Sequence, residues 1–328
     1  MRQVESLATV SVRPVMLTID GTLGSYFRAA LRVFSLNFQP HRYDLIHAHT
    51  GHSGVLACLQ VRYPAVFTYY GYDLDVPAED REGPRTKLER LVFRQLSRFV
   101  AGTIAQSERG RSHLPRAGLA RNAVIPNGID RELFAPMPRD QARRALGWEP
   151  EPPVVLFAAD PTRFTKRFEL ARLAVAEAQR HRPDLKLEIC GSVSPTDVPL
   201  WMNAADVLLL TSVGEGSPNV VKEAMACNLP VVSVDVGDVR EVIEGTRQCH
   251  IRASDPGALA GALLEVLSAL PERSDGREKS SDLDERTIAL RLRDVYEQAC
   301  LRGPGLFGFL PARLHVRSPS RASDVRST

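Results

Sequence analysis

The sequence has few cysteines, no long apolar run and little net charge. Five cysteines occur in 328 residues and none forms a C-x-x-C pair, which argues against a disulfide framework or a cysteine metal site. The longest apolar runs have only strand length, so no segment is typical of a transmembrane helix or a secretory signal. A net charge of +3 is too small to predict nucleic-acid binding. We therefore expect a cytoplasmic protein with reduced thiols, whose membrane contact would be peripheral, at the inner face.

The composition that is present is that of a globular protein with two domains. Hydrophobic residues make up 44% of the chain and charged residues 25%, and 328 residues exceed one ordinary domain. Short apolar runs alternate with amphipathic helical stretches, which is typical of βαβ units and parallel sheets. The sequence therefore predicts the α/β class, with two Rossmann-like, doubly wound domains that face each other across a cleft.

Prolines divide the chain into its expected parts. Five of them cluster within residues 136–153, and because proline disrupts regular ladders this stretch is predicted to be a linker. The predicted parts are a first domain at 1–135, the linker at 136–153, a second domain at 154–283, a C-terminal helix at 284–300, and a disordered basic tail at 301–328.

The segment from Glu215 to Glu223 carries the sharpest chemical pattern. It follows the apolar run Val207–Leu210 and opens a predicted helix, whose first backbone N–H groups and dipole favour an anion such as a diphosphate. Ser217 or Asn219 is expected to be the N-cap. Glu223 on the second helical turn suits the two hydroxyls of a ribose, and Glu215 on the loop suits a sugar. Alternatively, Glu215 only complements the helix dipole and Glu223 lies on a solvated face.

The surroundings of this segment resemble a known family. Residues 201–240, WMNAADVLLLTSVGEGSPNVVKEAMACNLPVVSVDVGDVR, are similar to the core of the family 4 glycosyltransferases, with the teichuronic-acid-biosynthesis type as the nearest pattern. Residues 124–130 resemble the family's interdomain hinge, and residues 157–168 resemble the loop after the first strand of its second domain. With weaker similarity between them, these motifs cover about residues 40–300.

The resemblance implies a fold and a reaction. The fold is GT-B, with a nucleotide diphosphate sugar as the donor substrate in the C-terminal domain. The reaction is retaining transfer of a hexose-type sugar, without a metal ion or other cofactor, to a cell-envelope or other glycan or lipid-linked acceptor. Family members are thought to use front-face attack, in which the leaving phosphate helps to deprotonate the acceptor hydroxyl. The protein then contributes positioning and charge stabilisation.

The resemblance also assigns roles to individual residues. Lys166 occupies the position of the lysine that meets the donor diphosphate, and Arg163 is the nearest substitute for a family arginine whose position is Pro161 here. Glu215 matches the glutamate near the donor sugar, and Glu223 the one on the ribose. The remaining donor-binding positions are Gly216, Ser217, Pro218, Asn219 and Val220. Without the resemblance, Lys166 and Arg163 would be interpreted as surface charges.

In the first domain the resemblance points to strand ends. His49 stands near the donor sugar and acceptor and joins Lys166 and Glu215 as a catalytic candidate, whereas His47 is better interpreted as a hydrogen-bonded core histidine. Tyr70 replaces a family histidine and cannot carry its positive charge. Asp73 either binds the acceptor or caps a turn. Residues Asn127 and Gly128 belong to the hinge motif.

The N-terminal residues depart from the family pattern. They resemble the end of the first helix, so residues 15–19 are expected to be the second strand, and the first strand with its glycine loop is expected to be missing. A competing interpretation takes residues 15–19, 21–24 and 26–34 as strand, phosphate loop and helix, on the weak evidence of one G-x-x-G.

A basic helical face suggests a further partner. Lys87, Arg90, Arg94 and Arg98 recur at helical spacing, which suits peripheral contact with an anionic membrane or, alternatively, an ordinary solvated face. The leading functional hypothesis is a hexosyltransferase that uses a UDP- or GDP-sugar. The alternatives are a truncated, weakly active or inactive nucleotide-sugar-binding protein and a nucleotide-sugar epimerase, the latter opposed by the close local match at residues 215–228.

Overall fold

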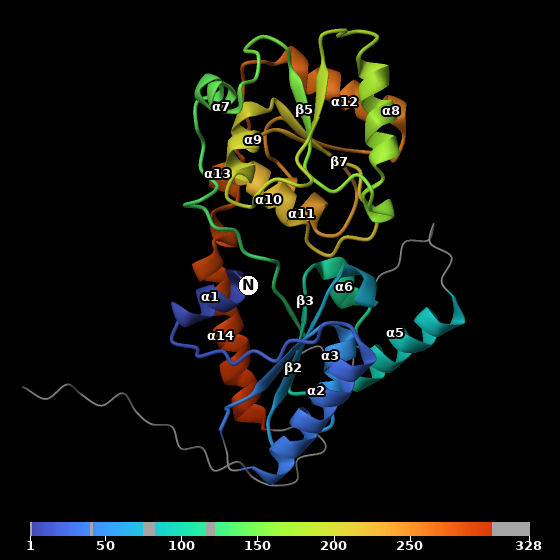
Figure 1. Cartoon of the computed structure of the whole chain (residues 1–328), viewed down its shortest axis with the longest axis vertical. Helices are drawn as coiled ribbons and strands as arrows, with labels where there is room; N and C mark the ends of the chain where they lie inside the picture. The colour runs from blue at the N-terminus through green and yellow to red at the C-terminus, as the bar shows by residue number, and fades with distance from the viewer. Residues whose placement is uncertain (1, 40–41, 75–82, 116–121, 304–328) are drawn as a thin grey trace, which may run out of the picture.

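The computed structural model describes residues 2–39, 42–74, 83–115 and 122–303, and these form two stacked α/β units (Figure 1). The first unit holds a parallel sheet in the order β1-β2-β3-β4. Its strands are β1 (Ile46–His49), β2 (Ala65–Tyr69), β3 (Gly102–Ala105) and β4 (Asn122–Val124). The helices of this part of the chain are α1 (Arg2–Ala8), α2 (Leu23–Ser35), α3 (Gly51–Ala57), α4 (Gly71–Leu74), α5 (Pro84–Leu96) and α6 (Glu108–Ser112).

The second unit holds a parallel sheet in the order β6-β5-β7-β8-β9. Its strands are β5 (Val154–Phe157), β6 (Lys186–Ile189), β7 (Val207–Leu210), β8 (Val231–Val234) and β9 (Cys249–Arg252). Its helices are α7 (Arg139–Leu146), α8 (Phe168–Ala178), α9 (Val198–Ala204), α10 (Asn219–Ala226), α11 (Val239–Ile243), α12 (Pro256–Ser268) and α13 (Gly276–Lys279). The chain reverses its winding between β5 and β7, and ligands of such sheets bind at the carboxyl ends of the strands beside that point.

Burial explains the apolar runs of the second sheet. Every residue of β5, β7 and β8 is buried, because helices cover both faces of the sheet and no strand face meets water. The two parallel sheets confirm the predicted α/β class with two domains. The winding reverses in the second sheet, whereas the described strands of the first sheet follow chain order. Among the described residues, no helix is both long enough and apolar enough to cross a membrane.

The last helix returns to the first unit. Helix α14 (Glu285–Arg302) packs against α1, β2 and β3, and Figure 1 shows it running alongside the first sheet. Its residues Ile288, Leu292 and Tyr296 join Val66 and Ile104 in one core cluster. The predicted C-terminal helix therefore completes the core of the first domain. Most of the predicted tail, residues 304–328, lies outside the described residues.

Two segments cross between the domains side by side. Ile129 N–H donates to the Leu283 carbonyl at 2.9 Å, and Glu285 N–H donates to the Ile129 carbonyl at 3.0 Å. An ideal Cβ on Gly128 would lie 2.9 Å from Glu285 Cα, so only glycine allows this close approach. The predicted linker, residues 136–153, contains α7, which packs against α9 of the second domain. The chain passes between the two sheets earlier, next to Ile129.

The expected second strand at residues 15–19 is wrong. This segment has no regular secondary structure, and Val15 and Met16 are 64% and 59% exposed. A strand needs a neighbour for its N–H and C=O groups, and within the described ranges β1 pairs with no strand other than β2. The competing strand–phosphate loop–helix interpretation fails for the same reason. Its helix does form, as α2, and Thr22 caps it by accepting the Ser25 N–H at 3.2 Å.

Candidate functional site

The loop at residues 214–218 joins β7 to α10 and lies beside the reversal point of the second sheet. Pro218 occupies the N-cap position of α10 and no side chain caps the helix, so neither Ser217 nor Asn219 is the predicted N-cap. Proline at this place fixes the entry of the chain but offers no side-chain acceptor. The first backbone N–H groups of α10 therefore keep the arrangement that suits an anion.

Lys166 reaches this loop from the neighbouring strand end. It ends a short 3-10 helix, Phe164–Lys166, in the connection after β5, and its Nζ donates to Glu215 Oε1 at 2.5 Å. Both side chains are about one-fifth exposed, at 20% and 21%. Thr211 Oγ donates to the Lys166 carbonyl at 2.9 Å, which fixes the two connections together. The structure thus brings Lys166 and Glu215 together, whereas Arg163 lies exposed at the start of the 3-10 helix.

The other donor candidates lie on α10 beside this loop. Glu223 sits half-buried on the second turn of the helix, where a ribose contact was predicted. Asn219 is exposed at the first helical position, and Val220 packs against the core of the second domain. Among the described residues, no group of three or more His, Cys, Asp or Glu side chains is placed to hold a metal ion.

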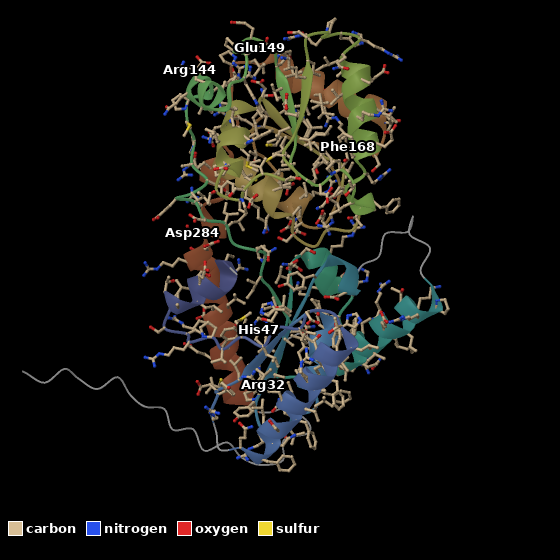
Figure 2. All side chains as sticks on the ribbon, viewed as in Figure 1. Arg32, His47, Arg144, Glu149, Phe168 and Asp284 are labelled. Carbon is tan, nitrogen blue, oxygen red and sulfur yellow. The ribbon has the colours of Figure 1, made fainter. Side chains whose placement is uncertain are left out.

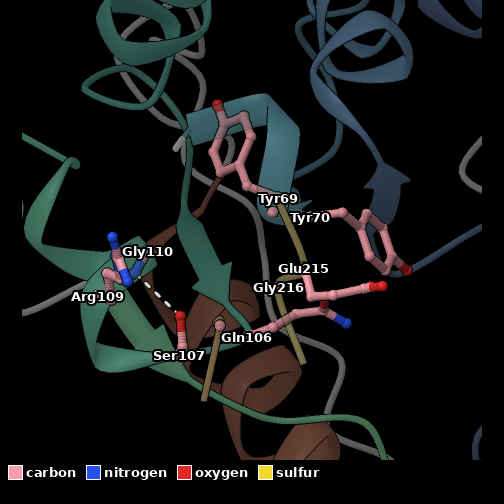
Figure 3. Close-up of a pocket in the computed structure, with 10 residues that line it drawn as sticks. Tyr69, Tyr70, Gln106, Ser107, Arg109, Gly110, Glu215 and Gly216 are labelled. Carbon is pink, nitrogen blue, oxygen red and sulfur yellow. Dashed lines mark hydrogen bonds between the residues drawn. The ribbon is translucent and has the colours of Figure 1, made fainter. Parts of the chain in front are cut away.

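Three glycines allow backbone segments to approach closely at a narrow pocket, Gly71 from the first domain and Gly216 and Gly237 from the second. An ideal Cβ on Gly71 would lie 2.6 Å from Gly216 N, and one on Gly237 would lie 2.6 Å from Gly216 O. Any side chain there would force the segments apart, so glycine is required by the approach itself. Figure 3 shows Glu215 and Gly216 between Tyr70 and Gln106, which come from the first domain. The pocket therefore draws on both domains.

His49 and Tyr70 form a neutral polar pair on the first-domain side. His49 Nδ1 lies 2.9 Å from the Tyr70 hydroxyl, and the two rings stack. Burial lowers the pKa of His49 below its usual range, and burial together with Asp73 raises the pKa of Tyr70 to about 12. The pair is therefore uncharged near neutral pH and can exchange hydrogen bonds with a sugar hydroxyl.

Asp73 caps a turn in this structure. Its Oδ2 accepts the Tyr70 N–H at 2.9 Å, at the start of α4. Burial raises the pKa of the Asp73 carboxyl, and the backbone N–H groups of Tyr70 and Gly51 oppose that shift. Of the two roles expected for Asp73, the contacts are those of the capping residue. Contact with an acceptor stays a prediction.

His47 is a hydrogen-bonded histidine of the first-domain core (Figure 2). Its Nδ1 lies 2.7 Å from the Tyr296 hydroxyl on α14, and its Nε2 lies 2.7 Å from Thr68 Oγ1 on β2. Both ring nitrogens are thereby occupied within the domain, so His47 joins the last helix to the sheet. This matches the interpretation of His47 as structural.

The stability of the protein should fall in mild acid through His47. Burial, with the charge of His49, lowers the pKa of His47 well below its usual range, so the unfolded chain takes up this proton first. Stability is then present above about pH 6.5 and is lost as the pH falls below it, by up to about 1.4 kcal/mol per pH unit. We expect His47→Gln to reduce that slope, as measured by urea unfolding at about pH 7.5 and about pH 5.5.

A suitable control for this prediction is His52→Gln, which replaces a histidine whose side chain is 52% exposed. It measures how far the slope changes when a histidine outside the Tyr296 and Thr68 contacts is replaced. His49 and His250 also have lowered pKa values from burial, and part of the slope will remain in His47→Gln. An identical slope in His47→Gln and the unsubstituted chain would contradict the assignment.

The hinge motif lies directly under the 214–218 loop. Asn127 Oδ1 accepts from Gln106 Nε2 at 2.5 Å, and Asn127 Nδ2 donates to the Ser217 carbonyl at 3.4 Å. Sequence reasoning missed Gln106, although a polar residue directly after the buried strand β3 is a signal for a strand-end site. It also missed Lys222 and Asp238, which are buried beside Ser217.

Two family models match the chain. The model described as Glycosyltransferase Family 4 matches residues 4–133. The model described as Glycosyl transferases group 1 matches residues 163–269, which include Lys166 and the 214–218 loop. The two matches fall on the two structural domains.

Curated relatives carry a common name. A D-inositol 3-phosphate glycosyltransferase from Paenarthrobacter aurescens is 29% identical over 301 residues, which are 78% of this chain and 73% of the relative. Its counterpart from Thermobispora bispora is 27% identical, over 87% of this chain and 77% of the relative. These relatives are of a different type from the teichuronic-acid enzymes whose pattern the sequence motifs suggested, and this finer expectation is not supported.

Solved structures share the fold. Sucrose-phosphate synthase from Thermosynechococcus elongatus superimposes with a TM-score of 0.67 at 20% identity, over 89% of this chain and 82% of that one. Anabaena HepE, in complex with UDP and glucose, gives 0.66 at 20% identity, over 85% and 84%. At these identities the likeness concerns the fold alone.

Proposed function

Because the chain belongs to the family 4 glycosyltransferases and has the GT-B fold, we propose that it moves a hexose from a nucleoside-diphosphate sugar with retention of configuration. The observation that carries the proposal is the pairing of Lys166 with Glu215 beside the first turn of α10. A cation and a helix N-terminus face the same place, next to the reversal point of the sheet, and both favour a diphosphate.

In the proposed reaction each residue of the site has a separate role. Lys166, released from Glu215, would neutralise the diphosphate as it leaves, together with the backbone N–H groups at the start of α10. Glu215 would then accept hydrogen bonds from hydroxyls of the donor sugar, and Glu223 from those of the ribose. His49 and Tyr70 would orient the acceptor hydroxyl from the first domain, while the leaving phosphate takes its proton.

Two further points concern the substrates. Solved relatives in the fold bind UDP and UDP-glucose, which supports a uridine donor, with a guanosine donor as the alternative. For the acceptor we propose a hydroxyl of a cell-envelope glycan or a lipid-linked saccharide. The name of the curated relatives favours a second candidate, an inositol phosphate.

A panel of nucleotide sugars tests the proposal. The chain is incubated with UDP- and GDP-hexoses, with and without inositol phosphate or lipid-linked saccharides, and the released nucleoside diphosphate is measured. Acceptor-dependent release supports a transferase and identifies the acceptor. Binding without turnover would instead indicate a nucleotide-sugar-binding protein, and interconversion of the sugars without an acceptor would indicate an epimerase.

Membrane contact through α5 is a further part of the proposal. Lys87 and Arg94 on α5 and Arg98 just after it are exposed, and on α5 Leu88 and Leu91 are 61% and 51% exposed. Helix α2 adds an apolar stripe, of which Phe27 and Leu31 are 66% and 55% exposed, with Arg28 and Arg32 beside it. Helix α3 contacts both α2 and α5. Exposed cationic and apolar side chains on such helices suit an anionic bilayer surface, at about 1 kcal/mol per basic residue.

Charge reversal should abolish this contact. We expect simultaneous replacement of Lys87, Arg90, Arg94 and Arg98 by glutamate to reduce sedimentation with phosphatidylglycerol vesicles at least about tenfold. The matched control reverses four basic residues of the second domain, Arg172, Arg180, Arg182 and Lys186, which are at least 39% exposed. Equal sedimentation of both variants and the unsubstituted chain would argue against a membrane surface on α5.

A further inference from the structure

A buried lysine lies beneath the 214–218 loop. Lys222 sits on α10 with no exposed side-chain surface, among the buried residues Val221, Ala224 and Met225. Its Nζ donates to the Ser217 hydroxyl, lies 3.2 Å from Asp238 Oδ2, and donates to the Asn127 carbonyl at 3.3 Å. An ammonium group has three protons, so these three acceptors use all of them. Lys222 therefore has no donor left for a substrate.

The Ser217 hydroxyl is occupied by the same cluster. Ser217 is 5% exposed, and its Oγ accepts from Lys222 and donates to Asp238 Oδ2 at 2.6 Å. Asn127 N–H also approaches this Oγ, at 3.4 Å. The side chain predicted to bind the donor is thus turned into the protein, and Ser217 has only its backbone to offer at the loop surface.

The cluster joins the loop to the first domain. The Asn127 carbonyl accepts from Lys222, and the Asn127 side chain accepts from Gln106, which directly follows β3. An ideal Cβ on Gly216 would lie 2.6 Å from Gln106 Oε1, so the loop packs directly on the same residue. A continuous path of contacts runs from β3 through Asn127 and Lys222 to the loop.

The energetics of the Lys222–Asp238 pair favour a role in positioning the loop over a role in stabilising the fold. Burial lowers the pKa of Lys222 and raises the pKa of Asp238, and each partner opposes the shift of the other. Taking both charges from water costs much of what their attraction returns, so an apolar pair of similar size gives comparable stability. In addition, Asp238 Oδ1 is buried without a hydrogen-bond partner among the described residues. Unlike an apolar pair, Lys222 and Asp238 fix the orientation of the hydrogen bonds that they make.

We propose that Lys222 is a positioning residue that, together with Asp238, fixes the 214–218 loop against the hinge through the Ser217 hydroxyl and the Asn127 carbonyl. The loop so held presents the backbone that receives the donor diphosphate. The nature of the ligand rests on the proposed function, whereas the fixing of the loop is a property of the chain itself.

Hydrogen exchange tests the fixing of the loop without any ligand. Ser217→Ala removes the link but keeps the Lys222–Asp238 pair, and Lys222→Met removes the cation. Both should accelerate exchange of the loop amides relative to those of β7 by about tenfold, and the double variant should go no further than the faster single one. Arg143→Met is the matched control, because Arg143 is another buried cation of this domain, bound to Asp206. It should leave the ratio of loop to β7 exchange unchanged.

Nucleotide binding gives the second measurement. Titration with UDP and GDP should show affinity weakened about tenfold in each single variant and no further weakening in the double variant. Additive losses in the double variant, or a loop-to-β7 ratio equal to that of Arg143→Met, would overturn the positioning role. Should the unsubstituted chain bind neither nucleotide, the proposed function fails, and the exchange ratios still decide the role of Lys222.

Discussion

Replacing Lys166 by alanine should weaken binding of the donor nucleotide by about 10- to 100-fold, because hydrogen bonds to charged groups contribute about 1.5–3 kcal/mol. The Lys166 ammonium is held by Glu215, at 2.5 Å, and both side chains are only about one-fifth exposed. A diphosphate offers more negative charge than one carboxylate, so it should take this cation. Titration calorimetry with UDP or GDP measures the loss directly.

A matched control is available in Lys186. This lysine also pairs with a glutamate, Glu149, but it lies at the amino end of β6, opposite the edge that carries the loop. Lys186→Ala should therefore leave nucleotide affinity within about twofold of the unsubstituted chain, since exposed pairs contribute little. Equal nucleotide affinities of Lys166→Ala and Lys186→Ala would show that the diphosphate does not bind near Lys166, which would contradict the proposed donor site.

The largest loss of stability is expected at Asp206. Its carboxylate is fully buried and accepts from Arg139 Nε, from an Arg143 guanidinium nitrogen and from Val154 N–H, each at 2.7 Å. Asp206→Ala leaves the buried Arg143 charge without its counter-ion, and breaking such a pair costs about 3–5 kcal/mol. Urea unfolding of the second domain, followed by tryptophan fluorescence of Trp148 and Trp201, measures this change, because both rings pack near α7 and α9.

The control for Asp206 is an exposed aspartate of the same domain. Asp184 pairs with Arg182 at 3.2 Å, but its side chain is 52% exposed. Asp184→Ala should shift the free energy of unfolding by less than about 0.5 kcal/mol. If Asp206→Ala shifted it no more than Asp184→Ala does, the buried cluster would not be what attaches α7 to the second domain.

Much of the fold was predictable because apolar runs of strand length mark buried parallel strands. Strand β7 has the bounds of the apolar run Val207–Leu210, and β2 coincides with a second such run, AVFTY at residues 65–69; both strands are buried throughout. Strand β9, with the sequence CHIR, is not predicted by an apolar run, because its residues are only half-buried and two of them are polar. Residues 15–19 are the opposite case, because their apolar side chains predict a strand that does not form. A strand also needs a neighbouring strand to pair with, and an apolar run does not specify that neighbour.

The proximity of candidate residues was predictable where chain order alone brings them together. In a doubly wound sheet the connections after β5 and β7 meet at the reversal of winding, so Lys166 and Glu215 had to be close. Lys222 could not be found in this way. A lysine in the run NVVKEAMA suggests a solvated position, and only the packing of α10 against Asp238 and Asn127 shows that it is buried.

The return of α14 makes the second domain an insertion into the first, entered at Ile129 and left at Asp284 (Figures 1 and 2). Two adjacent crossings that are hydrogen-bonded to each other form a short hinge between the domains. Opening of the interdomain pocket should then be a hinge bending about the Ile129–Asp284 bridge. The second domain carries Lys166, the 214–218 loop and Lys222, and the first domain carries His49 and Tyr70. The proposed donor and acceptor groups would therefore come together and separate in one movement.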